Sequence, residues 1–479
     1  MKQKFLMNRQ YLFLLAITLG FSIPVAAQSE LKVKVYTSES ANTEMLVQKE
    51  DITLVSDLET ENQLINIYPQ FEYQEILGFG SSFTETSAYN VAQLSDDMQR
   101  KLIEACFDPE KGNAFNFCRT NIHSSDFSLA QYNYTDENDV ELKTFSIAHD
   151  QKYILPMIKA AKALSKDLYL IASPWSPPGW MKDTKQMIRG GQLLPEHYET
   201  WARYMTRYFE EYKKEGIDFY CVSVQNEPKA VQTWESCVYS GTEEAMFAVN
   251  NLRPNLDKAG FKDVKIVVWD HNKERVLDRA IESFAVPGAK DAIWGVGFHW
   301  YSGDHFDALR MTHEMFPDKP LLLTEFCRGN SRATGALGDW ADAEAYANEI
   351  IGDFNNYMTA SIDWNMVVDL QGGPYSDRTG GCKAPIVVDK EKNTFTMEPA
   401  FYAVGHFSRF VKRGAKRIGN SVYNVDLKVA SFKNPNDEVV VVVLNKAERA
   451  VNTRLRIYDS TAQVNIPAKS LTTLIVPRR

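Results

Sequence analysis

Two glutamates stand at the ends of short apolar runs, and this pair of carboxyls is the feature of the chain best suited to chemistry. Run 219–228, FYCVSVQNEP, places Glu227 directly after a strand-like segment, and run 320–328, PLLLTEFCR, places Glu325 in the same way. Two carboxyls at strand ends can divide the acid/base and nucleophile roles at the anomeric carbon of a sugar. The pair therefore predicts a glycosidase with Glu227 as acid/base and Glu325 as nucleophile.

Each role sets a condition on its carboxyl. Glu227 must carry a proton near neutral pH, so we expect burial and the Glu325 carboxylate to raise its pKa. Glu325 is expected to stay ionised and to attack the sugar. Arg119, near the end of another apolar run, is the candidate cation that keeps a carboxylate charged, with a structural ion pair as the alternative.

Aromatic and polar side chains follow the same runs. Flat aromatic rings offer rigid contact area to the apolar faces of sugars, although core packing explains many buried tryptophans. The aromatic residues are Trp175, Trp180, Trp234, Trp300, Tyr301 and Trp364, and the polar candidates for binding hydroxyls are Asp126, Asp270, His271, Asn272 and His299. Six aromatic residues at run ends favour a carbohydrate cleft, while each polar residue retains a structural alternative.

Apolar runs of strand length alternate with helical patterns from residue 75 onward, which is typical of βα units around a parallel sheet. Eight such runs are found, at 76–79, 115–122, 168–172, 219–224, 264–269, 293–300, 321–324 and 362–368. The segment after Pro195 shows a helical face that ends at Gly216. The expected fold class is α/β, a (β/α)8 TIM barrel whose active site lies at the carboxyl ends of its strands.

Alternating apolar and polar residues flank this region. They occur at 31–36 and in parts of 51–68, and again at 421–432, 439–444, 451–458 and 471–476. This period of two predicts antiparallel strands, here a side β-sandwich. We expect the barrel over 71–398, the C-terminal sandwich over 399–479, and N-terminal strands within 28–70 that join the sandwich because they are too few to be stable alone.

The first 27 residues have the pattern of a signal peptide. Basic residues precede the apolar stretch 11–17, and Val25-Ala-Ala27 offers small residues for cleavage. No later segment has the roughly 20 apolar residues of a membrane span. The first cysteine, Cys106, is too distant from the leader to carry a lipid anchor. The expected location is therefore periplasmic or secreted.

The composition of the chain argues against several classes of partner and cofactor. A formal charge of −9 argues against nucleic acid. No CxxC or HExxH motif occurs, so we expect no catalytic metal, and no cofactor is predicted. The six cysteines are expected to be mostly free thiols; one disulfide stays open, and their spacing does not name the pair. Oligomeric state is also left open.

Several motifs together resemble glycoside hydrolase family 30, whose members include glucosylceramidases and β-1,6-glucanases. In chain order they are GFGSSFTE (78–85), ASPWSPPGW (172–180), VQNEP (224–228), HWY (299–301), TEFC (324–327), DWN (363–365), GGP (372–374) and GHFS (405–408). The resemblance covers nearly the whole chain from residue 70. It implies a barrel with a side sandwich and hydrolysis with retention of configuration.

The resemblance also implies substrate contacts. Trp175, Asn226 and Trp364 would contact the sugar that precedes the cleaved bond, with Asn226 bonding its 2-hydroxyl. Glucosylceramidases carry Asp where this chain has Glu85, so the carboxylate that should hold the distal hydroxyls of a terminal glucose is displaced by one methylene.

The expected substrate is a β-linked glucan, with β-1,6-glucan and endo action as the main hypothesis. The alternatives are a glucosylceramidase, an exo-acting β-glucosidase or a β-xylosidase. A non-catalytic carbohydrate-binding protein is a further alternative, but such a protein is expected to lose one of the two glutamates, and both are present.

Overall fold

The computed structural model describes residues 31–329, 339–374 and 382–478, so the expected signal peptide at 1–27 lies outside the described residues. Within these ranges, no helix is long and apolar enough to cross a membrane.

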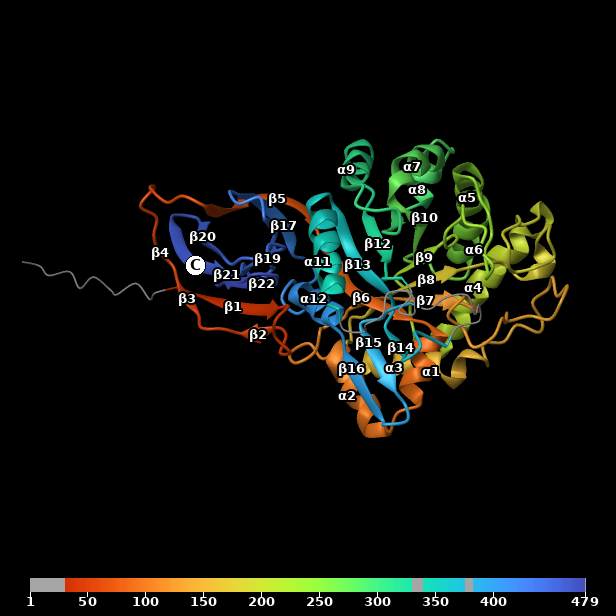
Figure 1. Cartoon of the computed structure of the whole chain (residues 1–479). Coiled ribbons are helices and arrows are strands. Elements are labelled where there is room, and N and C mark those ends of the chain that lie inside the picture. Colours follow the sequence, from red (N-terminus) through yellow and green to blue (C-terminus); the bar gives the residue numbers. More distant parts are fainter. Residues whose placement is uncertain (1–30, 330–338, 375–381, 479) are drawn as a thin grey trace, which may run out of the picture.

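Eight parallel strands close into a barrel, which lies centrally in Figure 1. They are β6 (Gly78–Phe83), β7 (Phe117–Ile122), β8 (Tyr169–Pro174), β9 (Cys221–Ser223), β10 (Lys265–Asn272), β11 (Gly295–His299), β12 (Leu321–Glu325) and β13 (Met358–Asn365). Each coincides at least in part with one of the eight apolar runs, so the predicted TIM barrel is confirmed. Strands that are buried on both faces carry nearly continuous apolar sequence, which explains why the sequence alone predicts these strands.

The interior of the barrel is filled by apolar side chains from successive strands, among them Phe117, Ile171, Val267, Leu322 and Ile362. At the end where the strands begin, the guanidinium of Arg413 stacks 3.6 Å from the ring centre of Tyr169. It also donates hydrogen bonds to the backbone oxygens of Leu77 and Asn116. This end of the barrel is closed by packing, which leaves the carboxyl ends of the strands for a site.

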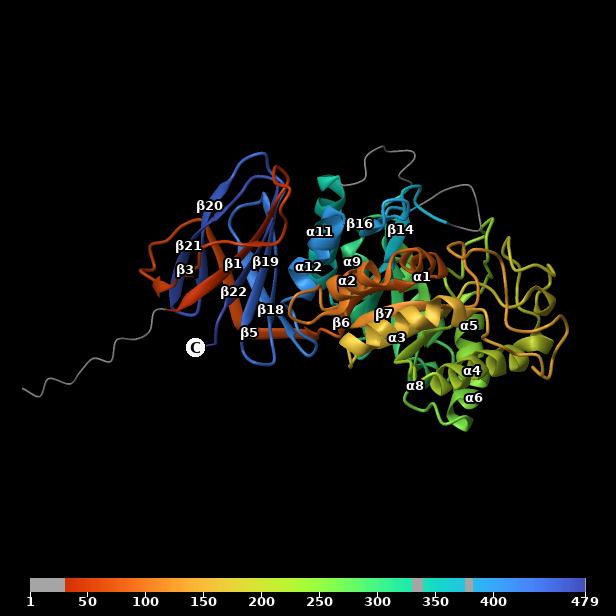
Figure 2. The same ribbon diagram turned by 90° about the horizontal axis from the view of Figure 1, so that it is seen from below.

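Helices surround the barrel (Figures 1 and 2). They are α1 (Glu85–Ala92), α2 (Asp96–Phe107), α3 (Ile154–Leu164), α4 (Tyr198–Lys214), α5 (Gly241–Phe247), α6 (Arg253–Lys258), α7 (Val276–Phe284), α8 (Ala289–Ala292), α9 (Phe306–Met315), α11 (Trp340–Asn355) and α12 (Pro399–Ser408). The predicted helix after Pro195 is confirmed as α4. It ends two residues before Gly216, which adopts a φ of +79° that a side chain would disfavour.

The second sheet system is the β-sandwich seen on the left of Figure 1. Its strands are β1 (Lys32–Glu39), β2 (Val47–Gln48), β3 (Ile52–Thr53), β4 (Val55–Ser56), β5 (Leu64–Glu75), β17 (Lys416–Val422), β18 (Leu427–Lys433), β19 (Val439–Asn445), β20 (Val451–Ile457), β21 (Ser460–Ile466) and β22 (Ser470–Val476). N-terminal β1 pairs with β22, and β5 pairs with β17 and β20. The chain thus enters the barrel from this sheet and returns to it.

Two sequence expectations for the strands need correction. The alternation at 421–432 is not one strand, because a turn in which Leu427 N donates to Asn424 O separates β17 from β18. The run 362–368 is also not one strand, because β13 ends at Asn365 and β14 (Val367–Asp369) belongs to a separate three-stranded sheet with β15 (Ile386–Asp389) and β16 (Thr394–Met397). The sequence missed β15, β16 and β21. These strands are short or carry polar residues, so their periodicity is weak.

Helices α11 and α12 lie between the barrel and the sandwich in both views (Figures 1 and 2). From α12, His406 bonds across this boundary: Nε2 is 2.8 Å from Ser38 Oγ on β1, and Nδ1 is 2.8 Å from Thr473 Oγ1 on β22. Burial lowers the pKa of His406 to about 3, so a neutral ring joins the two parts.

Candidate active site

A cavity of about 340 Å³ opens where the barrel strands end, and we call it the mouth cavity. It is lined by Asp126, Trp175, Asn226, Glu227, Gln232, Trp234, His271, Asn272, Tyr301, Glu325, Cys327, Gly329, Trp364 and Cys382. Both glutamates therefore face one cavity. Among the residues predicted to contact substrate, Asp126, Trp175, Asn226, Tyr301 and Trp364 also line this cavity.

Glu325 is the last residue of β12, and two neighbours hold its carboxylate. Arg119 Nη1 donates to Oε2 at 2.6 Å, and the Tyr301 hydroxyl donates to Oε1 at 2.9 Å. The side chain is 8% exposed, so the ion pair with Arg119 is shielded from solvent. A charge-assisted hydrogen bond at this distance is strong and fixes the direction of the carboxylate.

Glu227 sits on unusual backbone. Its φ is +46°, a left-handed conformation that residues with a side chain seldom adopt, and Asp270 opposite has the same value. The Glu227 N–H donates to the Asp270 carbonyl at 2.9 Å, and β10 shifts register between Trp269 and His271. The irregular backbone after β9 and in β10 therefore brings the side chains of Glu227, Asp270 and His271 close together.

Two histidines contact the Glu227 carboxyl. Nδ1 of His299 lies 3.2 Å from Oε1, and Nδ1 of His271 lies 3.5 Å from the same oxygen. Burial alone would raise the pKa of Glu227, but the two imidazoles outweigh it and hold the pKa below its usual range. The expectation of a raised pKa is therefore wrong for the free site, because the sequence did not reveal these partners.

His299 holds the proton that Glu227 lacks. Burial disfavours its charge, but the Glu325, Asp270 and Glu227 carboxylates around it raise its pKa to about 9. Its Nε2 lies 3.1 Å from Asp270 Oδ1. The ring therefore bridges two carboxylates from beneath the mouth cavity, where the sequence had predicted a contact with a sugar hydroxyl.

Arg119 is fully buried under the cavity and connects its parts. Besides Glu325, its guanidinium donates to Asn226 Oδ1 and Asp270 Oδ2, each at 2.8 Å, and to Ser173 Oγ at 3.0 Å. Although burial opposes its charge, the Asp270 and Glu325 carboxylates raise the pKa of Arg119. A fixed cation of this kind offsets the cost of burying the two carboxylates that contact it.

Two parallel aromatic rings form one wall. Trp175 and Trp364 stack at 4.9 Å with an interplanar angle of 21°, and the Arg119 guanidinium lies 4.7 Å from the Trp175 ring. Trp234 also lines the cavity. Trp180 does not, because it is buried in the outer core against His197.

The predicted carboxyls Asp126 and Glu85 take different positions. Asp126 lines the cavity, and burial, reinforced by Glu325, raises its pKa well above the usual range. Glu85 lies outside the lining: Oε1 is 2.7 Å from His149 Nε2, and Oε2 accepts from Leu129 N at 3.0 Å. These contacts occupy the carboxylate that the sequence had assigned to substrate.

Family comparison agrees with this geometry. The model of the glycosyl hydrolase family 30 TIM-barrel domain matches residues 76–411, and that of the family 30 β-sandwich domain matches residues 414–474. The chain belongs to glycosyl hydrolase family 30. It is therefore a glycoside hydrolase, as the paired carboxyls predicted.

The family 30 relatives differ in activity. Putative glucosylceramidase 4 of Caenorhabditis elegans is 33% identical, over 92% of this chain and 89% of the relative. The endo-1,6-β-D-glucanase of Neurospora crassa is 27% identical, over 79% and 80%. Among solved structures, SrfJ from Salmonella typhimurium is 33% identical with a TM-score of 0.91, and the endo-β1,6-glucanase BT3312 is 26% identical with a TM-score of 0.84; each covers 94% of this chain and 100% of its own.

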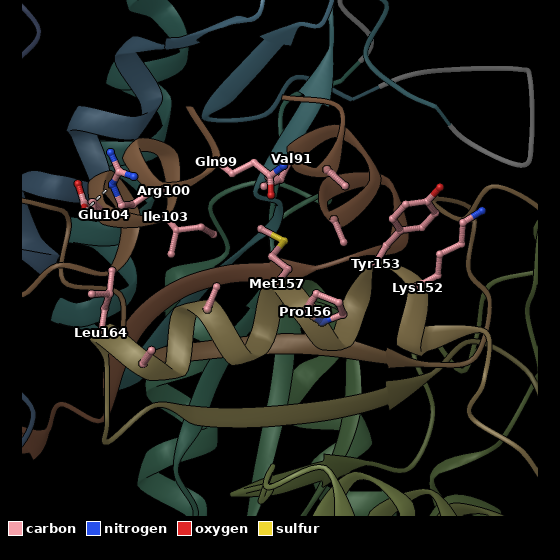
Figure 3. A pocket seen from close by; sticks show the side chains of 14 residues that line it. Val91, Gln99, Arg100, Ile103, Glu104, Lys152, Tyr153, Pro156, Met157 and Leu164 are labelled. Carbon is pink, nitrogen blue, oxygen red and sulfur yellow. Dashed lines mark ion pairs between the residues drawn. The ribbon is translucent and has the colours of Figure 1, made fainter. Parts of the chain in front are cut away.

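A second hollow of about 340 Å³ lies outside the family 30 barrel, between α1, α2 and α3, and we call it the wall groove (Figure 3). Apolar side chains such as Val91, Ile103 and Met157 line it. Its ion pair, Arg100 with Glu104, is largely solvent-exposed. Glu104 is the single carboxyl among its lining residues, so the wall groove lacks the carboxyl pair of a glycosidase.

A cation could in principle be held by Glu227, His271 and His299, whose ligand atoms all lie within 4.8 Å of one another. His299 Nδ1 bonds Glu227 Oε1 at 3.2 Å, and His271 Nδ1 approaches the same oxygen at 3.5 Å. A metal there would occupy the Glu227 oxygen that has to move a proton, so this arrangement fits family 30 hydrolysis better than metal chemistry.

Some residues of this family 30 site were not recognised as site residues from the sequence, although Ser173 lies within the motif at 172–180. Ser173 supports Arg119, and Gln232 Nε2 lies 3.5 Å from the second oxygen of Glu227. Cys382 was not recognised as a cavity residue at all. Asp270 was a loop candidate, but its role as the common partner of Arg119 and His299 depends on the bulge in β10, which no local motif announces.

Proposed function

We propose that the chain hydrolyses β-glycosides by double displacement with retention of configuration. The observation that carries this proposal is the asymmetry of the two carboxyls: Glu325 is held by a fixed cation and a tyrosine, whereas Glu227 is contacted by two imidazoles. The Glu325 carboxylate attacks the anomeric carbon and forms a glycosyl ester, while Glu227 protonates the leaving oxygen. Glu227 then takes a proton from the water that cleaves the ester.

The proton for the first step belongs to Glu227 and His299 as a pair. In the free site it resides on His299, which donates toward Glu227 Oε1. Transfer along this contact gives a neutral imidazole and a protonated Glu227, so no proton has to come from solvent. Strongly interacting groups of this kind titrate as a unit.

Stereochemistry tests the proposal directly. The full chain is incubated with an aryl β-glucoside, and the first anomer released is followed by proton NMR before mutarotation. We expect the β-anomer. Initial release of the α-anomer would mean a single inversion, with Glu325 acting as a base and not as the nucleophile.

We further propose that the substrate is a β-1,6-linked glucan cleaved within the chain. A third hollow, of about 680 Å³, shares Tyr301, Cys327 and Gly329 with the mouth cavity and continues to Trp300 and Trp340. It offers room for sugar units beyond the reacting one. The likeness to the endo-β1,6-glucanase BT3312 over 94% of this chain supports the linkage.

The alternative is a glucosylceramidase or exo-acting β-glucosidase, favoured by the higher identity to putative glucosylceramidase 4. Product analysis over time separates the two, with β-1,6-glucan, an aryl β-glucoside and glucosylceramide as substrates. We expect a ladder of β-1,6 oligosaccharides. Glucose as the sole product, with turnover of glucosylceramide, would overturn the glucanase proposal.

We also propose that residues 1–27 direct the chain out of the cytoplasm and are removed. N-terminal sequencing of the protein recovered from the periplasm or medium should begin at Gln28. A chain that retains its first 27 residues in the cytoplasm would contradict this.

A further inference from the structure

Two thiols meet at the rim of the mouth cavity. Cys327 lies two residues beyond Glu325, and Cys382 lies shortly before β15; both line the cavity. Their sulfurs are 3.1 Å apart. That separation exceeds the roughly 2.05 Å of an S–S bond by only about 1 Å.

The backbones that carry these thiols already run side by side. Next to the cysteines, Lys383 N donates to Arg328 O at 3.2 Å. The Asp342 carboxylate binds both segments, at 3.1 Å from Arg328 Nε and 2.7 Å from Lys383 Nζ. Small rotations of two side chains would therefore bring the sulfurs to bonding distance without moving either segment.

The other four cysteines offer a contrast. Cys106, Cys118, Cys221 and Cys237 are buried, whereas Cys382 is partly exposed. A soluble oxidant can therefore reach Cys382 first. Cys327 is only 5% exposed, but its sulfur adjoins that of Cys382 and can react with Cys382 once an oxidant has modified it.

We propose that Cys327 and Cys382 form a disulfide that braces the wall of the mouth cavity beside Glu325. A thiolate of Cys382 attacks a disulfide-bearing oxidant and expels one of its sulfurs as a thiolate. The Cys327 thiolate then attacks the mixed disulfide and releases the second sulfur. Overall, the two cysteines lose two electrons and two protons, and the oxidant is reduced to two thiols.

The proposed disulfide would act on residues that hold Glu325, the nucleophile. The Cys327 carbonyl accepts a hydrogen bond from Trp300 Nε1 at 3.0 Å, and its sulfur lies 3.5 Å from the Tyr301 hydroxyl, which bonds Glu325. Fixing Cys327 therefore restricts Tyr301. The cross-link itself does not depend on the proposed function; only its effect on turnover does.

The test oxidises the full chain with oxidised glutathione. The contact with Cys327 and burial raise the pKa of Cys382, so the reaction should be faster at alkaline pH. We expect the unfolded protein to show two fewer of its six thiols and a mass lower by about 2 Da. Peptide mapping without reduction should recover Cys327 linked to Cys382.

Two cysteine variants test whether the cross-link joins Cys327 to Cys382. C382S should retain its thiols under the same treatment, whereas C237S, the matched control, should still form the cross-link. Six remaining thiols in the wild type, a stable glutathione adduct, or a link between other cysteines would each overturn the proposal.

Stability supplies a readout independent of activity. Reduction of the cross-linked chain should lower the melting temperature by a few degrees, and the same reductant should leave the melting temperature of C382S unchanged. A cross-link that forms without any change in melting temperature would overturn its bracing role. Because neither readout measures hydrolysis, a failure here is distinguishable from a failure of the proposed glycosidase chemistry.

Discussion

The mouth cavity and the wall groove have the same volume, about 340 Å³, but different chemistry. Beneath the first lie Arg119, Asp270 and His299, all fully buried and bonded to one another or to the two glutamates. In the second, the side chains of Arg100 and Glu104 remain 61% and 47% exposed over an apolar floor.

Buried charge explains the difference. Removing a charged group from water costs several kcal/mol, and only a complete set of partners offsets that cost. The mouth cavity provides such partners and so keeps ionised groups oriented for reaction. The wall groove is a gap in helix packing. Size alone therefore does not identify a catalytic site in this molecule. Substitutions of the same type in the mouth cavity and in the wall groove should have different effects on activity.

Glutamine substitutions should give the largest contrast. E325Q removes the nucleophile and E227Q the proton donor, so each should lower kcat by at least about 10³-fold. E104Q in the wall groove is the matched control and should keep wild-type turnover. Steady-state hydrolysis of an aryl β-glucoside measures all three, and near-wild-type kcat in E325Q or E227Q would reject the assignment.

Added azide distinguishes the two glutamates. A small anion can replace the missing carboxylate of an alanine variant, attacking the sugar directly in E325A or the glycosyl ester in E227A. We expect an α-glycosyl azide from E325A and a β-glycosyl azide from E227A, because the second reaction includes two inversions. The opposite pair of products would exchange the roles.

Arginine substitutions should give the next contrast. Lysine in R119K keeps a charge but not the planar fork that reaches Glu325, Asn226 and Asp270 together. Loss of one or two charge-assisted hydrogen bonds should lower kcat/KM by about 10- to 100-fold. R100K in the wall groove should leave kcat/KM unchanged. Equal effects of the two variants would mean that the network does not support catalysis.

The fold and the two glutamates were predictable because their signals are local. Each barrel strand overlaps an apolar run; Glu325 ends β12 as predicted, whereas β9 ends at Ser223 and Glu227 follows on irregular backbone. The positions of these carboxyls follow from the geometry of a closed parallel barrel, in which all strand ends meet at one mouth.

The environment of the glutamates was not predictable because it depends on distant partners. Glu85 was expected at the substrate, but His149, 64 residues later, binds its carboxylate. The pKa of Glu227 was expected to rise, but His271 and His299, both from later strands of the barrel, lower it. No residue-by-residue pattern gives such pairings, and the left-handed backbone at Glu227 and Asp270 has no sequence motif here.

The pH dependence tests the shared proton at the mouth cavity. The Glu227–His299 pair loses its proton as pH rises through about 9, the pKa of His299, so kcat/KM should fall on that alkaline side. In H299N the proton must stay on Glu227 alone. His271 still contacts the Glu227 carboxyl and holds its pKa down, so the alkaline limb should move to lower pH.

The control for this profile is H313N, since His313 stacks on Tyr357 away from the cavity. Its alkaline limb should coincide with that of the wild type. An unchanged limb in H299N would show that His299 only supports structure and does not hold the catalytic proton.

The smallest expected effect on activity comes from enlarging the wall groove. Met157 on α3 is 4% exposed and packs in the outer core, so M157A should remove buried apolar contacts and leave a larger void. A truncation of this kind costs about 2–5 kcal/mol of unfolding free energy. Because the barrel wall separates this site from the carboxyls, kcat at a temperature well below melting should remain at the wild-type value. Denaturant unfolding and steady-state kinetics on the same preparation measure both quantities. A fall in kcat without loss of stability would show that the wall groove communicates with the mouth cavity, and the two hollows would then have to be treated as one functional unit.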